Sequence, residues 1–123
     1  MKQRKPRIGV LAVGRSTFDV EYAGKVFGQA WQALQGVDAV LVGEPRIHYE
    51  ADAALAAFAV LKASDIDLLL VVQATFTDAA VVTAIAGNLD VPLVVRTFPE
   101  ERTGGRLRLN SFCGANLAAH ALS

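Results

Sequence analysis

The sequence predicts an α/β domain in which helices cover both faces of a parallel sheet of four to five strands, a doubly wound arrangement. The first observation is the run Leu68–Val72, whose consecutive apolar residues are typical of a strand buried on both faces. The second is that such runs alternate with segments whose apolar residues recur at helical spacings of three and four. Strands that alternate with helices imply parallel pairing through right-handed crossovers.

Length and composition limit the class of protein. The 123 residues suggest one domain over residues 1–123, and the 53% hydrophobic content is enough for a sizeable core. No apolar run approaches the roughly 20 residues of a membrane span, and the basic segment Met1–Arg7 is not followed by a secretion signal. We therefore expect a cytoplasmic protein with no membrane partner.

Charge and cysteine content exclude further classes. The chain has 12 basic and 12 acidic residues, so there is no overall attraction to nucleic acid, and we expect no nucleic-acid partner. The single cysteine, Cys113, excludes an internal disulfide and a cysteine-based metal cluster. His48 and His120 are isolated, which favours structural or exposed roles for both. We also find no nucleophile with an adjacent base.

The first predicted strand, Ile8–Val13, leads through a polar connection into the first helix. Ser16, Thr17 and Asp19 are candidate N-caps of this helix, and Gly36 is expected to end it. The apolar face of the helix comprises Ala23, Val26, Phe27, Ala30, Trp31 and Leu34.

The middle of the chain predicts a second strand over Val37–Val42, which Gly43–Pro45 ends. A second helix follows over about Ala51–Ala63. We expect this helix to bury Ala54, Leu55, Phe58 and Leu61.

The third strand is Leu68–Val72, and a helix over Asp78–Ala86 follows it, with Val81, Val82 and Ile85 facing inward. Pro92–Val95 begins a fourth strand, since proline is tolerated at the first residue of a strand. Two elements near the C-terminus are a short fifth strand at Arg106–Leu109 and a short helix from Cys113 to Leu122. Because such a short helix is a poor end for a domain, either it docks tightly or the chain is the front part of a longer protein, and we expect the second.

The strand Leu68–Val72 runs directly into the polar segment Gln73–Asp78. In open parallel sheets, ligands bind where strands end and helices begin. Gln73 and Thr75 offer hydrogen-bonding groups, and Phe76 offers an apolar face to a sugar ring. The alternative is that the segment merely caps the next helix while Phe76 packs in the core, but capping does not account for Gln73 and Thr75. We therefore predict a polyol-binding site here.

The segment Gly14–Thr17 after the first strand is a second candidate site. A helix N-terminus attracts anions and hydroxyl-rich ligands, and Arg15 adds a fork of hydrogen-bond donors. The alternative is an ordinary capped helix with a surface arginine. The segment has no G-x-G-x-x-G pattern, which excludes a dinucleotide fingerprint.

Two strings, Gln73–Asp78 and Thr97–Leu122, resemble the N-terminal region of L-fucose isomerase-like and L-arabinose isomerase-like proteins. The likeness covers nearly the whole chain. It implies a flavodoxin-like, three-layer version of the doubly wound fold. Members of the family are longer enzymes that interconvert aldoses and ketoses, usually with a bound divalent metal that is often manganese. Their N-terminal domain helps to cover the sugar site, often that of a neighbouring subunit.

By this resemblance, Arg15 matches a basic position that contacts the substrate, and Gln73, Thr75 and Phe76 match a loop that faces the sugar. The family's metal ligands and acid–base residues lie in later domains. The resemblance therefore implies no catalytic residue, metal ligand or cofactor in this chain, and no activity from the chain alone. Mn²⁺ or a similar metal is expected only in the full-length enzyme.

Two other functions stay open on the sequence alone. One is a stand-alone flavodoxin-like module that binds a polyol or a phosphorylated ligand, and the other is a structural or assembly domain. A truncated doubly wound domain would expose apolar sheet surface, and such patches tend to associate. We therefore expect a homo-oligomer, with a sugar that binds the isolated chain weakly or not at all.

Overall fold

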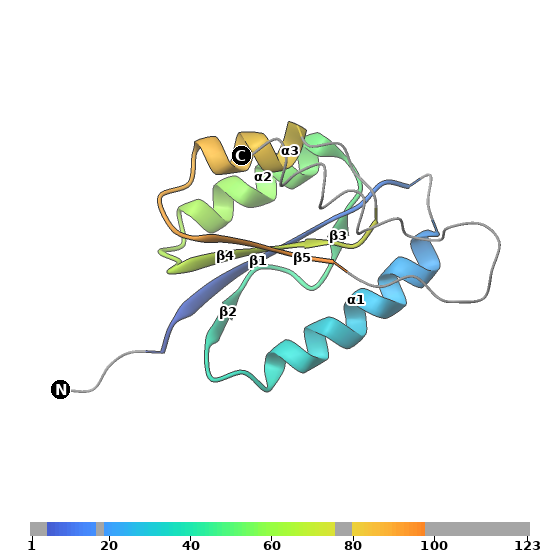
Figure 1. The fold of residues 1–123 in the computed structure, drawn as a ribbon, viewed down its shortest axis with the longest axis horizontal. Helices are drawn as coiled ribbons and strands as arrows, with labels where there is room; N and C mark the ends of the chain where they lie inside the picture. The colour runs from blue at the N-terminus through green and yellow to red at the C-terminus, as the bar shows by residue number, and fades with distance from the viewer. Residues whose placement is uncertain (1–4, 17–18, 76–79, 98–123) are drawn as a thin grey trace.

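The computed structural model describes residues 5–16, 19–75 and 80–97 (Figure 1). In chain order the elements are β1 (Arg7–Val13), α1 (Val20–Gln35), β2 (Val40–Val42), β3 (Ile47–His48), α2 (Ala51–Lys62), β4 (Leu68–Gln73), α3 (Ala80–Gly87) and β5 (Leu93–Arg96). The strand predicted at Arg106–Leu109, the helix predicted at Cys113–Leu122 and the candidate site residue Phe76 lie outside the described residues.

All strand pairs of the sheet are parallel, in the order β2-β1-β4-β5. β4 pairs with β1 along one edge, so β2 and β3 share the other edge of β1. There β2 pairs with the first residues of β1 and β3 with the last. Helix α1 covers one face of the sheet, and α2 and α3 cover the other (Figure 1). This confirms the predicted α/β fold and agrees with a flavodoxin-like three-layer arrangement.

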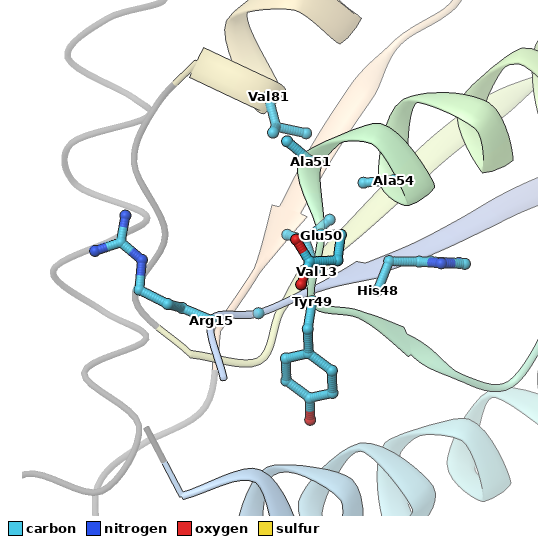
Figure 2. Close-up of a pocket in the computed structure, with 9 residues that line it drawn as sticks. Val13, Arg15, His48, Tyr49, Glu50, Ala51, Ala54 and Val81 are labelled. Atoms are coloured by element: carbon cyan, nitrogen blue, oxygen red, sulfur yellow. The ribbon is translucent and has the colours of Figure 1, made fainter. Parts of the chain in front are cut away.

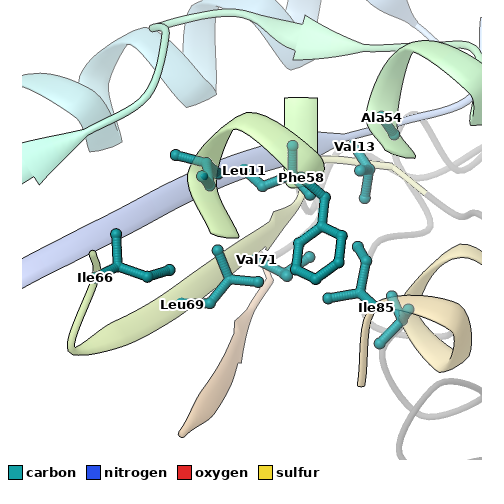
Figure 3. Packing of buried hydrophobic residues seen from close by; sticks show 10 residues of the cluster. Leu11, Val13, Ala54, Phe58, Ile66, Leu69, Val71 and Ile85 are labelled. Carbon is teal, nitrogen blue, oxygen red and sulfur yellow. The ribbon is translucent and has the colours of Figure 1, made fainter. Parts of the chain in front are cut away.

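Strand β4 is buried on both faces, as its apolar run predicts. Leu69 and Val71 pack into the core beneath α2 and α3, together with Phe58 and Ile85 (Figure 3). The alternate residues, Leu70 and Val72, pack into a second core on the α1 side, which contains Phe27. Side chains of a strand point alternately to opposite faces, so one strand serves both cores.

The ends of α1 follow the predicted capping chemistry. Of the candidate N-caps, Asp19 caps the helix, because its side chain accepts a 2.9 Å hydrogen bond from the backbone N–H of Tyr22. Gly36 occupies the C-cap position; its N–H donates to the carbonyl of Ala33, and the N–H of Val37 donates to the carbonyl of Leu34. Capping of this kind fixes where the helix begins and therefore where the connection from β1 ends.

Two predicted details of the middle segment are wrong. Leu55 is 36% exposed, because the side of α2 that faces the sheet carries Ala54, Phe58 and Leu61, and Leu55 is one helical step away from it. The second strand begins at Val40 rather than Val37, since residues 37–39 form a turn in which the N–H of Ala39 donates to the carbonyl of Val37. The sequence also gave no indication of β3.

Candidate functional site

Three strand ends meet at one edge of the sheet. Val13, the last residue of β1, pairs with His48 of β3 on one side and with Gln73 of β4 on the other. The chain leaves β1 through α1 on one face and enters β4 from α2 on the opposite face. The carboxyl end of β1 is therefore a topological switch point, which is where open α/β sheets bind ligands.

Two of the predicted site residues, Arg15 and Thr75, are brought together at this edge. The backbone N–H of Arg15 donates a 2.7 Å hydrogen bond to Oγ1 of Thr75. Beside it, the N–H of Ala74 donates to the carbonyl of Val13 at 2.9 Å. The segments that follow β1 and β4 are thereby held against each other, although 60 residues separate Arg15 from Thr75.

The structure divides the predicted site residues by depth. Gln73 and Thr75 are both 0% exposed, so they lie buried beneath the surface at the carboxyl ends of the strands. Arg15 is half-buried and lines an open cleft. Arg15 is therefore the predicted residue, among those described, that a ligand in this cleft would meet first.

The cleft lies between the end of β1 and the start of α2 and has a volume of about 180 Å³ (Figure 2). Its lining combines an apolar floor with polar groups at the rim. The lining residues are Val13, Gly14, Arg15, His48, Tyr49, Glu50, Ala51, Ala54 and Val81.

Sequence reasoning did not find Tyr49 and Glu50. They follow β3, which is only 2 residues long and shows no apolar run. The backbone N–H of Gly14 donates a 3.1 Å hydrogen bond to the carbonyl of His48, which holds the β3–α2 turn beside the end of β1. The signal that was available is the polar run His48–Glu50 directly before a predicted helix, although it lacks the apolar run that precedes Gln73–Asp78.

The side chain of His48 lines the cleft but also extends toward the protein interior. In Figure 2 its ring points away from Arg15, and it also borders a smaller cavity of about 80 Å³ beside Leu61 of α2. Nδ1 of His48 is buried and has no hydrogen-bond partner among the described residues. Burial is the main cause that lowers the pKa of His48; Arg46 lowers it further, and Glu44 opposes the shift.

Tyr49 and Glu50 keep groups that a ligand can use. A tyrosine phenol is protonated at neutral pH and can donate a hydrogen bond, and burial raises the pKa of Tyr49 further. Glu50 occupies the N-cap position of α2, but its carboxylate makes no capping hydrogen bond. The cleft therefore offers a donor and an acceptor on consecutive residues.

The described part of the chain contains no cluster of three or more His, Cys, Asp or Glu side chains that could hold a metal ion. The residues described therefore do not fit a manganese site, and no chemical step is assigned to a metal here. Within the same residues, no helix is long and apolar enough to cross a membrane.

A parallel, doubly wound sheet with a cleft at its switch point is the architecture in which open α/β domains bind ligands. The sequence model of one protein family, described as the fucose/sulfoquinovose isomerase N-terminal domain, matches residues 9–123. This chain belongs to that family, which confirms the resemblance to fucose isomerase-like proteins.

The chain is also similar to the sulfoquinovose isomerases of Priestia aryabhattai and Priestia megaterium. It is 29% identical to each over 110 residues, which is 89% of this chain and 25% of each relative. The matching region therefore spans about a quarter of the length of these curated relatives.

Proposed function

We propose that this chain forms one wall of the sugar site in an aldose–ketose isomerase and lacks the residues for catalysis by itself. The observation that carries the proposal is the hydrogen bond from the Arg15 N–H to Thr75 Oγ1, which joins two strand ends at the switch point. Beside this bond lies the cleft that Arg15 lines. Membership of the fucose/sulfoquinovose isomerase family supplies the class of substrate.

In this proposal Arg15 binds and orients the sugar. A guanidinium group presents several N–H donors in a fixed plane, which suits adjacent sugar oxygens. Thr75 contributes indirectly, because its hydroxyl accepts from the backbone of Arg15 and fixes where that side chain starts. The apolar floor of the cleft, which includes Val13 and Val81, suits the C–H faces of a sugar.

The proton transfer belongs to groups outside the described residues. A ketol isomerase moves a proton or hydride between adjacent carbons, and this requires an acid–base group or a metal that polarises the substrate oxygens. Mn²⁺ or a similar ion is therefore part of the proposal only for a longer protein that contains this chain. Phe76, which lies outside the described residues, stays a proposed sugar contact by resemblance.

We also propose that copies of the chain associate. An apolar groove of about 580 Å³ lies between α1 and the β4–β5 side of the sheet, lined by residues that include Leu34, Val72 and Val94. Val94 is 45% exposed, and exposed apolar surface of this kind favours association. A monomeric mass by light scattering at micromolar concentration would contradict this part of the proposal.

Calorimetric titration of the chain with L-fucose, L-arabinose and sulfoquinovose tests the function. The sequence left weak binding or no binding open for the isolated chain. The cleft beside Arg15 favours weak binding, so we expect weak binding of at least one sugar and its loss in Arg15→Ala. The matched control is Lys25→Ala, which removes the same charge from an exposed position on α1. Absence of binding by all three sugars, or equal affinity in Arg15→Ala, would contradict the sugar-binding role.

An isomerase assay of this chain alone with Mn²⁺ tests the second part of the proposal. Isomerase activity in this assay would contradict the claim that the chain is catalytically incomplete.

A further inference from the structure

We propose that Tyr49 and Glu50 form a second, hydroxyl-binding wall of the cleft and recognise the uncharged polyol part of the ligand. This rests on the proposed sugar-binding function and assigns two residues that neither the sequence nor the family match singled out. Both residues line the same cleft as Arg15 and reach it from a different segment of the chain.

The backbone fixes the two walls relative to each other. The hydrogen bond from the Gly14 N–H to the His48 carbonyl, 3.1 Å long, extends the pairing of β1 and β3 to the level of the cleft. Tyr49 and Glu50 follow immediately after this bond, and Arg15 follows Gly14 on the neighbouring strand end. The position of both walls is therefore set by the sheet rather than by a long loop.

The role of Glu50 is not explained by helix capping. N-cap positions favour Ser, Thr, Asp and Asn, whose short side chains reach the free N–H groups of the first turn. Glu50 holds this position without a capping bond. Its carboxylate has no hydrogen-bond or ion-pair partner among the described residues either. Its exposed carboxylate lines the cleft and is available to accept from ligand hydroxyls, in hydrogen bonds that the negative charge strengthens.

Tyr49 complements Glu50 with a donor and an apolar ring. The ring lies so close to the end of β1 that a β-carbon at Gly14 would be 3.0 Å from its Cε1 atom. The phenol hydroxyl has no partner among the described residues. The ring can therefore pack against C–H groups while its hydroxyl binds a ligand oxygen.

The combination of groups fits a polyol better than a small anion. Arg15 supplies donors, Glu50 an acceptor and Tyr49 both, and sugar hydroxyls are themselves both donors and acceptors. The carboxylate of Glu50 would repel phosphate at the same place. In a sulfonated sugar, the hydroxyl-bearing part would meet Glu50 and the sulfonate would lie away from it.

Calorimetric titration of Glu50→Gln and Tyr49→Phe with the sugar that the wild-type chain binds tests this proposal. Each variant is expected to bind roughly three- to tenfold more weakly, the loss that corresponds to one hydrogen bond. Asp52→Asn is the control for Glu50, because Asp52 is exposed in the same first turn of α2 and does not line the cleft. Tyr22→Phe is the control for Tyr49, and both controls are expected to retain wild-type affinity.

The outcomes separate this proposal from the sugar-binding function. If Arg15→Ala weakens binding but Glu50→Gln and Tyr49→Phe do not, the second wall is wrong and the function stands. If no variant changes the affinity, both are wrong. Titration with inorganic phosphate is a further test. Because the carboxylate of Glu50 repels an anion, Glu50→Gln is expected to bind phosphate at least as well as the wild-type chain. Weaker phosphate binding by Glu50→Gln would overturn the proposal. Thermal unfolding of each variant checks that the loss is not a loss of fold.

Discussion

A β-carbon at Gly14 would lie 3.0 Å from Cε1 of Tyr49, closer than side chains normally approach. The same β-carbon would lie 3.3 Å from Oγ1 of Thr75. The missing side chain at Gly14 therefore lets three strand ends converge: the ring after β3, the end of β1 and the hydroxyl after β4. This close approach is the structural basis of the cleft.

Gly14→Ala is expected to displace the ring of Tyr49 and weaken sugar binding. Overpacking a well-filled site typically lowers the free energy of unfolding by about 1–3 kcal/mol. Chemical denaturation and calorimetric titration of the variant measure the two effects. Wild-type stability together with wild-type affinity would show that the contact between Gly14 and Tyr49 does not shape the cleft.

Gly24→Ala is the matched glycine variant, and we expect it to stabilise the protein. Gly24 is exposed within α1, and a β-carbon there would meet nothing within 4 Å. Alanine in a helix interior is favoured over glycine by roughly 0.5–1 kcal/mol. The same denaturation experiment should therefore give opposite signs for the two glycine variants, and destabilisation by Gly24→Ala would contradict the open space beside it.

Thr75→Val is expected to loosen the Arg15 segment. The substitution keeps the shape of the side chain but removes the oxygen that accepts from the Arg15 N–H at 2.7 Å. Loss of a partner for a partly buried N–H costs about 1–3 kcal/mol. Hydrogen exchange at the Arg15 amide should become faster in Thr75→Val and stay slow in Thr75→Ser, which retains the hydroxyl. Equal exchange rates in the two variants would contradict the predicted role of this bond.

His48 is expected to make the stability depend on pH. Its pKa is lowered in the folded protein, mainly by burial, so protonation is less favourable in the folded than in the unfolded state. The free energy of unfolding is therefore highest above the ordinary histidine pKa of about 6.5, where His48 is neutral in both states. It decreases as the pH falls below that value, because the unfolded chain then binds the proton more readily. The charged neighbours that affect His48 are Arg46, which lowers its pKa, and Glu44, which raises it.

Urea denaturation between about pH 7 and pH 5 measures this effect, and His48→Gln serves as the comparison. The wild-type chain should lose more stability over this interval than the variant, because glutamine does not titrate. A parallel decrease in both proteins would assign the pH dependence to other groups. The second histidine, His120, lies outside the described residues and is present in both proteins, so it cancels in the comparison.

The fold was predictable where burial and sequence pattern coincide. Strand β4 contributes to both cores, so its apolar run in the sequence reflects its position in the middle of the sheet. β3 was not predictable, because its 2 residues are held by pairing with the last residues of β1, a contact between distant segments. Leu55 was misplaced for a related reason: α2 is apolar on most sides, so its pattern does not show which side faces the sheet.

The candidate site was predictable in part. The rule that ligands bind at the carboxyl ends of parallel strands selected Arg15 and Thr75, and the structure places them in contact. The sequence did not reveal that Gln73 and Thr75 are turned inward, because a polar residue after a strand can point either way. Tyr49 and Glu50 were missed because their place in the cleft depends on the unpredicted strand β3.

Amide NMR chemical shifts of the chain, recorded while sulfoquinovose or L-fucose is added, test the central claim most directly. The account predicts that the largest changes cluster at the amides of Gly14, Arg15 and Thr75, which belong to the two strand ends joined at the switch point. Amides at the opposite edge of the sheet, such as Asp65, should not shift. Changes that centre on that edge or on the groove beside Val94, or no change with either sugar, would contradict the assignment of this chain as a wall of the sugar site.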